Sequence, residues 1–527
     1  MKRTLSLLLA LCVMLCASFP AFAEENLDTW LCDEKTTLTV CCYDAVNNSY
    51  PTISNDLRFW QWLEEYTNVH IEWEVHSHAD YETVKAVKLA SGQLDTDMIE
   101  LNDMQMAIQG GESGMFVDIA PHLEEWAPHA IAYDAEQDSQ YIESMTAADG
   151  SIWGLGGSVS PDIGHIVICY NTAWLEELGA EVPTTLDEFT ELCRQMKGVD
   201  FNGNGADDEI VLTSSGVDGL QTIATAFGLE GYEDTTNFAA VDGVVHSEMV
   251  SDEMREFLTY ANMLYEEGIL DPAITSNTAD LMSQQIAQDN VGIFIYYSAF
   301  AVTYGRLTTA GQADPLGEHY TLGGPLLGPN GDQYYVLRNR AAQGLTCVNA
   351  QSENIELAVR WLDTLINDPV VIMTRTCGFE GENYKLDENG EVELIYPEDG
   401  SVWDISQYGC GQISLPHHQT YDQLMNSRKA MTWYIDEYNA LLDPYCFIEP
   451  SVPTNVPAFT TEEQDLFDLV KSDCDDYFKE MRAKFITGEA DIETEWDAYV
   501  EMMNALGLED YTAAWQMVYD RVTADQA

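Results

Sequence analysis

Alternating strand and helix periods in the first hundred residues constrain the fold more than any other feature. Segments of strand-forming residues alternate with segments of helical spacing. One of the strand segments strictly alternates apolar and polar side chains. Ser54 and Asn55 are expected to cap the first helix, and Gly92 is expected to end the second. Such alternation is typical of parallel strands joined by right-handed crossovers, so it predicts an α/β fold. Strands are expected at residues 37–43, at 69–75 and from 98, and helices at 54–66 and up to 91.

The pattern continues along the rest of the chain. No internal repeat and no low-complexity linker divides it, which two lobes that share strands would explain. From residue 461 the sequence is helical, with one apolar stripe between Ile492 and Met503. Further strands are expected at 163–170, 291–295 and 334–337, a hairpin at 385–394, and helices at 172–178, 183–196 and 355–366.

Residues 1–23 have the order of a secretory signal peptide. Lys2 and Arg3 precede an apolar stretch that is too short to span a bilayer, and small residues then fit a signal peptidase site. We expect cleavage after Ala23. No later segment has the length and apolar character of a membrane helix, so the mature protein is expected to be soluble outside the cytoplasm.

The acidic composition excludes several classes of partner. Among 527 residues, 22 are Lys or Arg and 90 are Asp or Glu, which gives a formal net charge of -68. Nucleic acids and anionic membrane surfaces both require clustered positive charge, so neither is expected as a partner. The same surface attracts cations, including divalent metal ions.

Cysteine and histidine residues give weaker signals. Ten cysteines follow the signal peptide without a CxxC spacing, and we expect most of them to be buried thiols. His417 and His418 are adjacent, so their side chains should point in different directions, and a surface loop is expected there.

Residues 200–209 have the spacing of a calcium-binding loop. Side chains with oxygen atoms fall at positions 1, 3 and 5, and Gly205 at position 6 permits a sharp turn. Position 12 is Val211, so an acidic residue at position 10 would have to supply the last carboxylate. The alternative is a solvated Asn-Gly turn. The expected Ca²⁺ ligands are Asp200, Asn202, Asn204, the carbonyl of Ala206, Asp208 and Glu209.

No motif of a hydrolytic enzyme stands out. A secreted glycoside hydrolase would use two carboxylates at a defined separation, and among 90 acidic residues such pairs carry no information. The sequence has no G-x-S-x-G, no H-E-x-x-H and no P-loop. No catalytic residue is therefore assigned, and the glycoside hydrolase is kept as an alternative.

Several short stretches, in order from about residue 36 to 521, carry a family resemblance. They include SGQLDTD at 91–97, DGSIWG at 149–154, YNTAWLEELG at 170–179, GFEGENY at 378–384 and KFITGE at 484–489. The chain resembles the extracellular solute-binding proteins of ABC importers, above all the large oligosaccharide-type, lipoprotein-like members of Gram-positive bacteria. Thr96 departs from the family pattern, which has Pro at this position.

The resemblance implies a two-lobed fold of the type II periplasmic-binding-protein kind, with a hinge and a helical C-terminal segment. The N-terminal lobe would comprise residues 24–165 and about 320–372, and the C-terminal lobe residues 166–319 and about 373–527. A monomer would hold a carbohydrate, an oligosaccharide by family, between its lobes and deliver it unchanged to the permease of an ABC transporter. A binding protein that reports to a membrane kinase is an open alternative.

The resemblance also implies ligand-contacting residues. Sugar rings need flat apolar faces, and their hydroxyls need polar partners. The candidates lie after expected strands or near expected crossovers: Asp103, Trp153, Tyr296, Tyr297 and Trp403.

Two further family properties bear on this sequence. Members that resemble its 200–209 loop bind a structural Ca²⁺. Members are usually lipid-anchored through a Cys that follows a small residue. Here Leu precedes both Cys12 and Cys16, so a lipid anchor is not expected.

Overall fold

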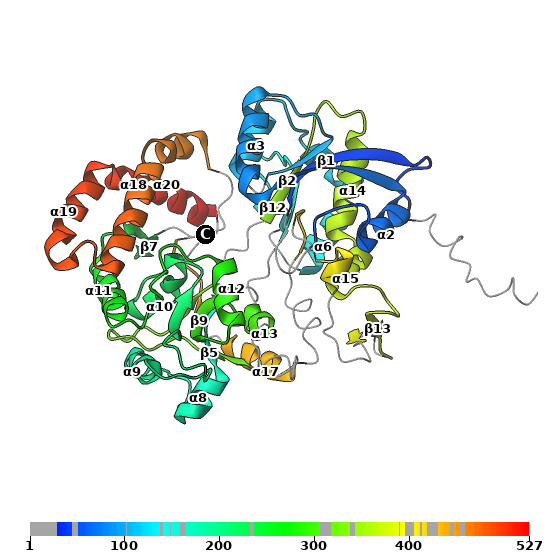
Figure 1. Cartoon of the computed structure of the whole chain (residues 1–527). Helices are drawn as coiled ribbons and strands as arrows, with labels where there is room; N and C mark the ends of the chain where they lie inside the picture. The colour runs from blue at the N-terminus through cyan, green and yellow to red at the C-terminus, as the bar shows by residue number, and fades with distance from the viewer. Residues whose placement is uncertain are drawn as a thin grey trace, which may run out of the picture.

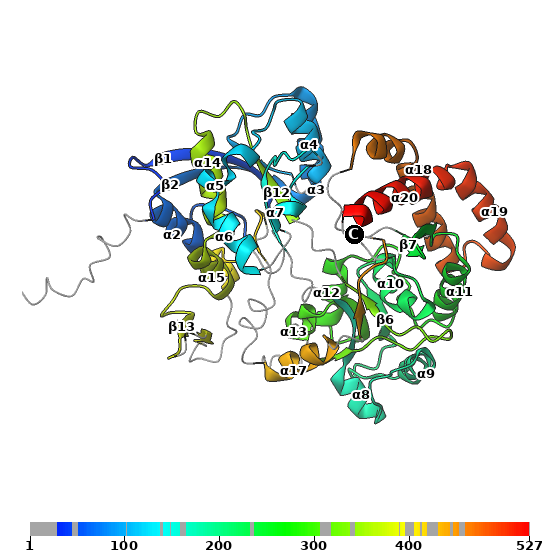
Figure 2. The same cartoon turned by 180° about the vertical axis from the view of Figure 1, so that it is seen from behind.

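The computed structural model shows two lobes, each built around its own β-sheet (Figure 1). The same separation is visible from behind (Figure 2). The expected signal peptide, residues 1–23, lies outside the described residues. These are 29–44, 51–101, 103–137, 141–147, 149–158, 165–231, 237–305, 318–337, 343–388, 390, 392–395, 405–411, 414–418, 431–442, 446–452 and 459–525.

The first lobe contains a five-stranded sheet in the order β2-β1-β3-β12-β4. As predicted, β1 pairs in parallel with β2 and β3. Strand β12 runs antiparallel to β3 and β4, so the sheet is mixed rather than purely parallel. Strand β12 enters the sheet after the chain has passed through the second lobe. The strands are β1 (Thr36–Asp44), β2 (Val69–Ser77), β3 (Met98–Glu100), β4 (Leu155–Gly157) and β12 (Gln343–Val348).

Helices cover this sheet and enclose one apolar core. The longest helices each bury an apolar face, and α14 contributes Trp361 and Leu362 to the core. Gly92 ends α3 in the left-handed conformation, as predicted. The elements are α2 (Arg58–Thr67), α3 (His78–Ser91), α4 (Met104–Glu112), α5 (Leu123–Trp126), α6 (Pro128–Gln137), α7 (Tyr141–Ser144), α14 (Ile355–Asn367), α15 (Pro369–Cys377), the hairpin β13 (Tyr384–Leu386) and β14 (Val392–Leu394), and 3-10 turns at Ala120–His122 and Ser406–Tyr408.

The predicted cap of α2 is wrong. The helix begins after Leu57, which makes no side-chain cap bond. Asn55 instead bonds across to β2: its Nδ2 donates to the Ile71 carbonyl at 2.9 Å, and its Oδ1 accepts from Trp73 Nε1 at 2.8 Å. Long-range partners therefore satisfy a side chain that the local sequence assigned to the helix end.

The second lobe contains a four-stranded sheet in the order β10-β5-β9-β6. Only β6 and β9 pair in parallel among its neighbouring strands, since β5 runs antiparallel to both β9 and β10. Two small two-stranded sheets complete the lobe. The strands are β5 (Ile166–Asn171), β6 (Ile210–Ser214), β9 (Val291–Tyr297), β10 (Tyr320–Gly323), the pair β7 (Phe238–Val241) and β8 (Val244–Ser247), and the pair β11 (Tyr335–Val336) and β15 (Phe447–Ile448).

Local signals explain the helices of the second lobe. Thr185 and Glu188 form a capping box at the start of α9, and the apolar stripe predicted between Ile492 and Met503 is buried in α19. The C-terminal helical segment is present as predicted, drawn in orange and red in Figure 1. The helices are α8 (Thr172–Leu178), α9 (Leu186–Met196), α10 (Gln221–Ala224), α11 (Asp252–Glu266), α12 (Ala279–Ala287), α13 (Ala299–Gly305), α17 (Thr432–Leu441), α18 (Thr461–Thr487), α19 (Ile492–Ala505) and α20 (Leu508–Asp525), with 3-10 turns at Val217–Leu220 and Thr225–Phe227.

Two segments lie in a different lobe from the one that the expected boundaries give them. Residues 320–323 form β10, which pairs with β5, and so lie with the second lobe rather than the first. Conversely, Phe379 and Ile405 pack in the core of the first lobe. The chain consequently crosses from one lobe to the other after residues 158, 337 and 418. These three crossings are called the first, second and third passage below. That the two lobes move about a hinge stays a prediction.

Two predictions about side chains and hydropathy can be compared directly with the structure. The ten cysteines after the signal peptide are free thiols, and eight of them are buried, which confirms that prediction for most of them. Among the helices that the structure describes, none combines the length and apolar character required to cross a bilayer.

Candidate functional site

Asp103 lies at the carboxyl end of β3, where the sequence places it. Its Oδ1 accepts hydrogen bonds from the backbone N–H of Gln105 at 2.7 Å and of Met106 at 3.1 Å. It is therefore the N-cap of α4, and its side chain is exposed. An exposed carboxylate fixed at a strand end is suited to accept hydrogen bonds from a hydroxylated ligand.

Trp153 packs against the other end of the same helix. A Cβ atom on Gly111 would lie 2.1 Å from the indole ring, so this helix position must be glycine to admit the tryptophan. About 12 Å of helix separates residues 103 and 111, at 1.5 Å per residue, so α4 holds the two candidates apart. Trp153 is half-buried, and its Nε1–H has no hydrogen-bond partner within the described part of the chain.

Tyr296 and Tyr297 end β9 in the second lobe, as predicted. Their rings meet edge to face with centroids 4.8 Å apart, and Phe300 lies 4.8 Å from Tyr296. Both tyrosines are partly exposed. Their strand partners are Val167 and Ile166, at the beginning of β5. The three aromatic rings therefore lie next to the first passage between the lobes.

The remaining candidate, Trp403, lies outside the described residues.

On the first lobe, a buried polar network joins Ser158, which precedes the first passage, to His418, which precedes the third. Ser158 N–H donates to His418 Nδ1 at 3.2 Å, and His418 Nε2 donates to Asn367 Oδ1 at 2.7 Å. The imidazole stacks on Tyr133 with ring centroids 3.5 Å apart. A Cβ on Gly157 would lie 2.0 Å from the His417 carbonyl, so only glycine permits this backbone approach.

This network corrects the prediction of a surface loop at residues 417 and 418. His418 is 3% exposed, and burial holds the pKa of its imidazole well below the ordinary value. It is thus a neutral structural side chain. No sequence signal could have found the contact, because Tyr133, Ser158 and Asn367 lie far from residue 418 in the chain.

Hydrogen bonds between side chains and backbone hold the 200–209 segment in a tight loop. Asp200 accepts from the backbone N–H of Asn204 at 3.1 Å and of Gly205 at 2.9 Å. Asn204 Nδ2 donates to both carboxylate oxygens of Asp208, at 3.1 and 3.2 Å. Glu209 accepts from the N–H of Phe201 at 3.0 Å and so joins the two ends of the loop.

The loop is anchored to the second lobe and has the backbone that such a turn requires. Gly205 has a φ of 79°, which a side chain would disfavour. The Phe201 ring stacks on Trp174 of α8 with centroids 4.1 Å apart. The donor set consists of hard oxygen atoms, which suits Ca²⁺. The residues therefore fit the predicted ion in chemistry and in order.

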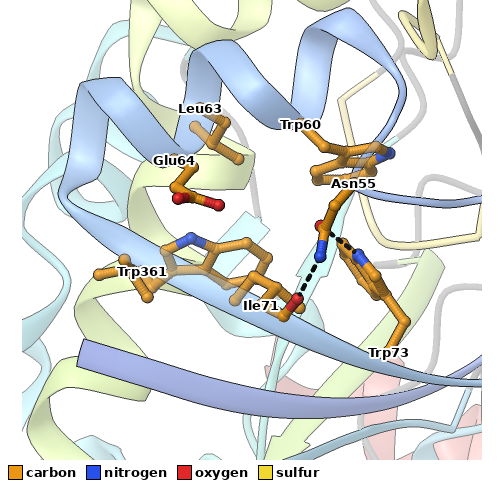
Figure 3. A pocket seen from close by; sticks show the side chains of 8 residues that line it. Asn55, Trp60, Leu63, Glu64, Ile71, Trp73 and Trp361 are labelled. Atoms are coloured by element: carbon orange, nitrogen blue, oxygen red, sulfur yellow. Dashed lines mark hydrogen bonds between the residues drawn. The ribbon is translucent and has the colours of Figure 1, made fainter. Parts of the chain in front are cut away.

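A pocket in the first lobe lies apart from these residues (Figure 3). It measures about 200 Å³ including the solvent at its mouth, below the range of roughly 300–1,000 Å³ usual for ligand sites. Asn55 bonds to Ile71 and Trp73 inside it. This is a gap between packed elements, too small for an oligosaccharide. Its lining is Asn55, Trp60, Leu63, Glu64, Val69, Ile71, Trp73 and Trp361.

Comparison with known families decides the relationship. The model of the bacterial extracellular solute-binding proteins matches residues 54–372, more than half of the chain. The chain belongs to this family. The predicted resemblance is therefore confirmed, and so is the mixed α/β fold of these solute-binding proteins.

Individual relatives extend the match over almost the whole chain. The fructooligosaccharide ABC transporter substrate-binding protein FusA of Streptococcus pneumoniae serotype 4 is 24% identical, over 97% of this chain and 95% of its own. Lipoprotein LipO of Bacillus subtilis is 21% identical, over 84% of this chain and 85% of its own.

Solved structures share the fold of this solute-binding protein. FusA in complex with kestose has a TM-score of 0.75 and 22% identity, covering 93% of this chain and 100% of that chain. FusA has also been solved as an EF-hand mutant in complex with fructo-nystose, with the same score. Alginate-binding protein AlgQ2, solved without calcium ion, has a TM-score of 0.75 at 19% identity, covering 93% and 99%.

Proposed function

We propose that this protein captures an oligosaccharide between its two lobes and delivers it, unchanged, to the permease of an ABC transporter. The observation that carries the proposal is similarity to FusA over nearly the full length of both chains. The shared fold with FusA in its kestose complex supports it. Binding needs only that the ligand stabilise the closed arrangement of the lobes more than the open one.

The proposed ligand contacts come from both lobes. Tyr296 and Tyr297 supply aromatic faces at the end of β9, and Asp103 supplies an exposed carboxylate. Trp153 supplies the accessible part of its half-buried indole ring, whose Nε1–H is itself buried and has no partner within the described residues. Trp403 keeps its proposed role from the sequence alone.

Isothermal titration calorimetry with kestose, and with alginate oligosaccharides as a second class, tests this function. We expect binding of at least one carbohydrate, and Tyr297→Ala should weaken it about tenfold or more, since about 1.4 kcal/mol of lost contact energy is tenfold in affinity. Tyr519→Ala is the matched control, because Tyr519 is also half-buried but lies in α20.

The same samples test the absence of catalysis. Chromatography of each glycan after long incubation should recover it intact. A glycan panel in which none binds and one is cleaved would replace the proposal with a hydrolase.

We further propose that the 200–209 loop holds a structural Ca²⁺ through the six predicted ligands. The hard-oxygen donor set and the positive φ at Gly205 support this, together with an EF-hand in the related FusA. The ion would neutralise the loop carboxylates and stiffen the loop, and it would have no catalytic role.

Export is proposed from the signal peptide at residues 1–23. The mature protein would begin after Ala23, without a lipid anchor, and act outside the cytoplasm. Mass spectrometry of the secreted protein should give this N-terminus, and a lipid-modified cysteine in its place would overturn the assignment.

A further inference from the structure

Strands β1 and β2 place three metal-ligating side chains beside one another on one face of the first sheet. Cys41 is the register partner of Glu74, and His76 follows Glu74 by two residues, so it points to the same face. One sulfur, one carboxylate oxygen and one imidazole nitrogen from these residues all lie within 4.8 Å of one another. This trio is separate from the 200–209 loop, which belongs to the other lobe.

The Glu74 carboxylate is the centre of the trio. His76 Nε2 lies 2.9 Å from its Oε1, and Lys88 Nζ of α3 lies 2.9 Å from the same oxygen. Cys41 is fully buried, whereas the side chains of Glu74 and His76 are about one-third exposed. An ion could therefore reach the buried sulfur from solvent by way of the carboxylate and the imidazole.

We infer that Cys41, Glu74 and His76 form a binding site for a thiophilic divalent cation of the Zn²⁺ class, with water as the fourth ligand. Thiolate, imidazole and carboxylate are the three donor types that Zn²⁺ uses in proteins, and three protein ligands with one water is a common arrangement. A thiolate does not suit Ca²⁺ or Mg²⁺, which prefer oxygen.

Binding would exchange protons for the ion. Burial raises the pKa of the Cys41 thiol to about 12, so the thiol is protonated in the free protein. On coordination the S–H proton leaves to solvent and a sulfur–metal bond forms. The imidazole binds in its neutral form through Nε2, and Glu74 turns from its hydrogen bonds to the ion.

Lys88 is expected to compete with the metal ion for Glu74. Its ammonium group contacts Glu74 and repels a cation at the same place. Lys88 would have to withdraw for the ion to bind, so it competes with the metal. A merely structural cluster would lose stability without Lys88, whereas a metal site would gain affinity.

Co²⁺ is the probe of choice, because a cobalt–thiolate bond gives a charge-transfer absorption that oxygen ligands do not give. The background protein carries Cys32→Ser and Cys446→Ser, which remove the two partly exposed thiols, and excess Ca²⁺ occupies the oxygen-rich loop. We expect a saturable band at one equivalent of Co²⁺, displaced by Zn²⁺.

Variants separate the site from other thiols. Cys41→Ser should abolish the band. His76→Asn removes a direct ligand and should weaken Co²⁺ binding by at least roughly 10- to 100-fold, the range for loss of an outer-shell partner. Cys42→Ser is the matched control, since the next residue of the strand points to the opposite face and should leave the band intact. Lys88→Met should tighten binding.

The results that would overturn the inference are equally specific. They are no thiolate band in the background protein, or a band that survives both Cys41→Ser and His76→Asn. A band lost in Cys42→Ser but not in His76→Asn would place the metal elsewhere. His76→Asn changes a partly exposed side chain, so it gives an answer even if Cys41→Ser does not fold.

Discussion

Single polar side chains in this protein take their roles from partners that are distant in sequence. Asn55, expected at a helix cap, bonds to β2, and His418, expected at the surface, is buried between Tyr133, Ser158 and Asn367. Burial of a polar group costs free energy unless it is hydrogen-bonded, so the fold brings partners to both. Glu100 is the exception that offers a test.

Glu100 should make stability depend on pH. It is 2% exposed, its Oε2 has no hydrogen-bond partner among the described residues, and burial raises its pKa from 4.5 to about 8. Because the folded pKa is the higher one, the stabilising contribution is complete below about pH 4.5 and is lost as pH rises to about 8.

Glu100→Gln keeps the shape and removes the charge. We expect the variant to be more stable than the parent by a few kcal/mol at pH 8–9, with little difference near pH 5. Urea unfolding across this range measures it. Glu256→Gln, at an exposed position in α11, should follow the parent curve; a parallel shift of both variants would contradict the assignment.

At the scale of elements, local sequence signals set the ends of helices, whereas contacts within the sheet set which strands are neighbours. The capping box at Thr185 and the left-handed Gly92 define helix ends from a few neighbouring residues. Which strands pair is decided by the sheet, which joins β12 to β3 across more than two hundred residues. The 200–209 loop combines both kinds of contact. Its turn depends on neighbouring residues, whereas its attachment to the lobe depends on the contact of Phe201 with Trp174.

Calcium should stabilise the second lobe through this loop. After treatment with a chelator, added Ca²⁺ should raise the melting temperature, and at about 100 times Kd the gain is roughly 2.7 kcal/mol. Asp200→Ala should remove most of the response. Asp207→Ala makes the same charge change in the same loop outside the proposed ligands, so it should keep the response; equal loss in both would favour a solvated turn.

At the scale of the whole molecule, the three passages of the chain between the lobes set what motion is possible. On the first lobe, the Ser158–His418 contact fixes two of the passages to one body. The ring cluster of Tyr296, Tyr297 and Phe300 borders the first passage on the second lobe. If the proposed ligand binds at these rings, it lies close to one of the connections between the lobes, where rotation of one lobe against the other would close the molecule.

Ligand should close the molecule. X-ray scattering is expected to show a smaller radius of gyration with saturating kestose, or with another carbohydrate that binds in calorimetry. To move an open-to-closed ratio from 99:1 to 1:99, the ligand must bind the closed form about 10⁴-fold more tightly. Tyr297→Ala should shift the transition to higher ligand concentration. A ligand that binds without any change in scattering would exclude closure.

Periodicity, helix caps and short motifs, each contained within a few neighbouring residues, were enough to predict the α/β class, most helices, the helical C-terminal segment and the family. The order of oxygen donors in the 200–209 loop could be predicted for the same reason. Four features became known from the folded molecule alone: the mixed sheets, the lobe to which residues 320–337 belong, the burial of His418, and the contact of Cys41 with Glu74 and His76. Each of these is a contact between segments far apart in the chain, and no local pattern encodes which distant partner a strand or side chain will meet.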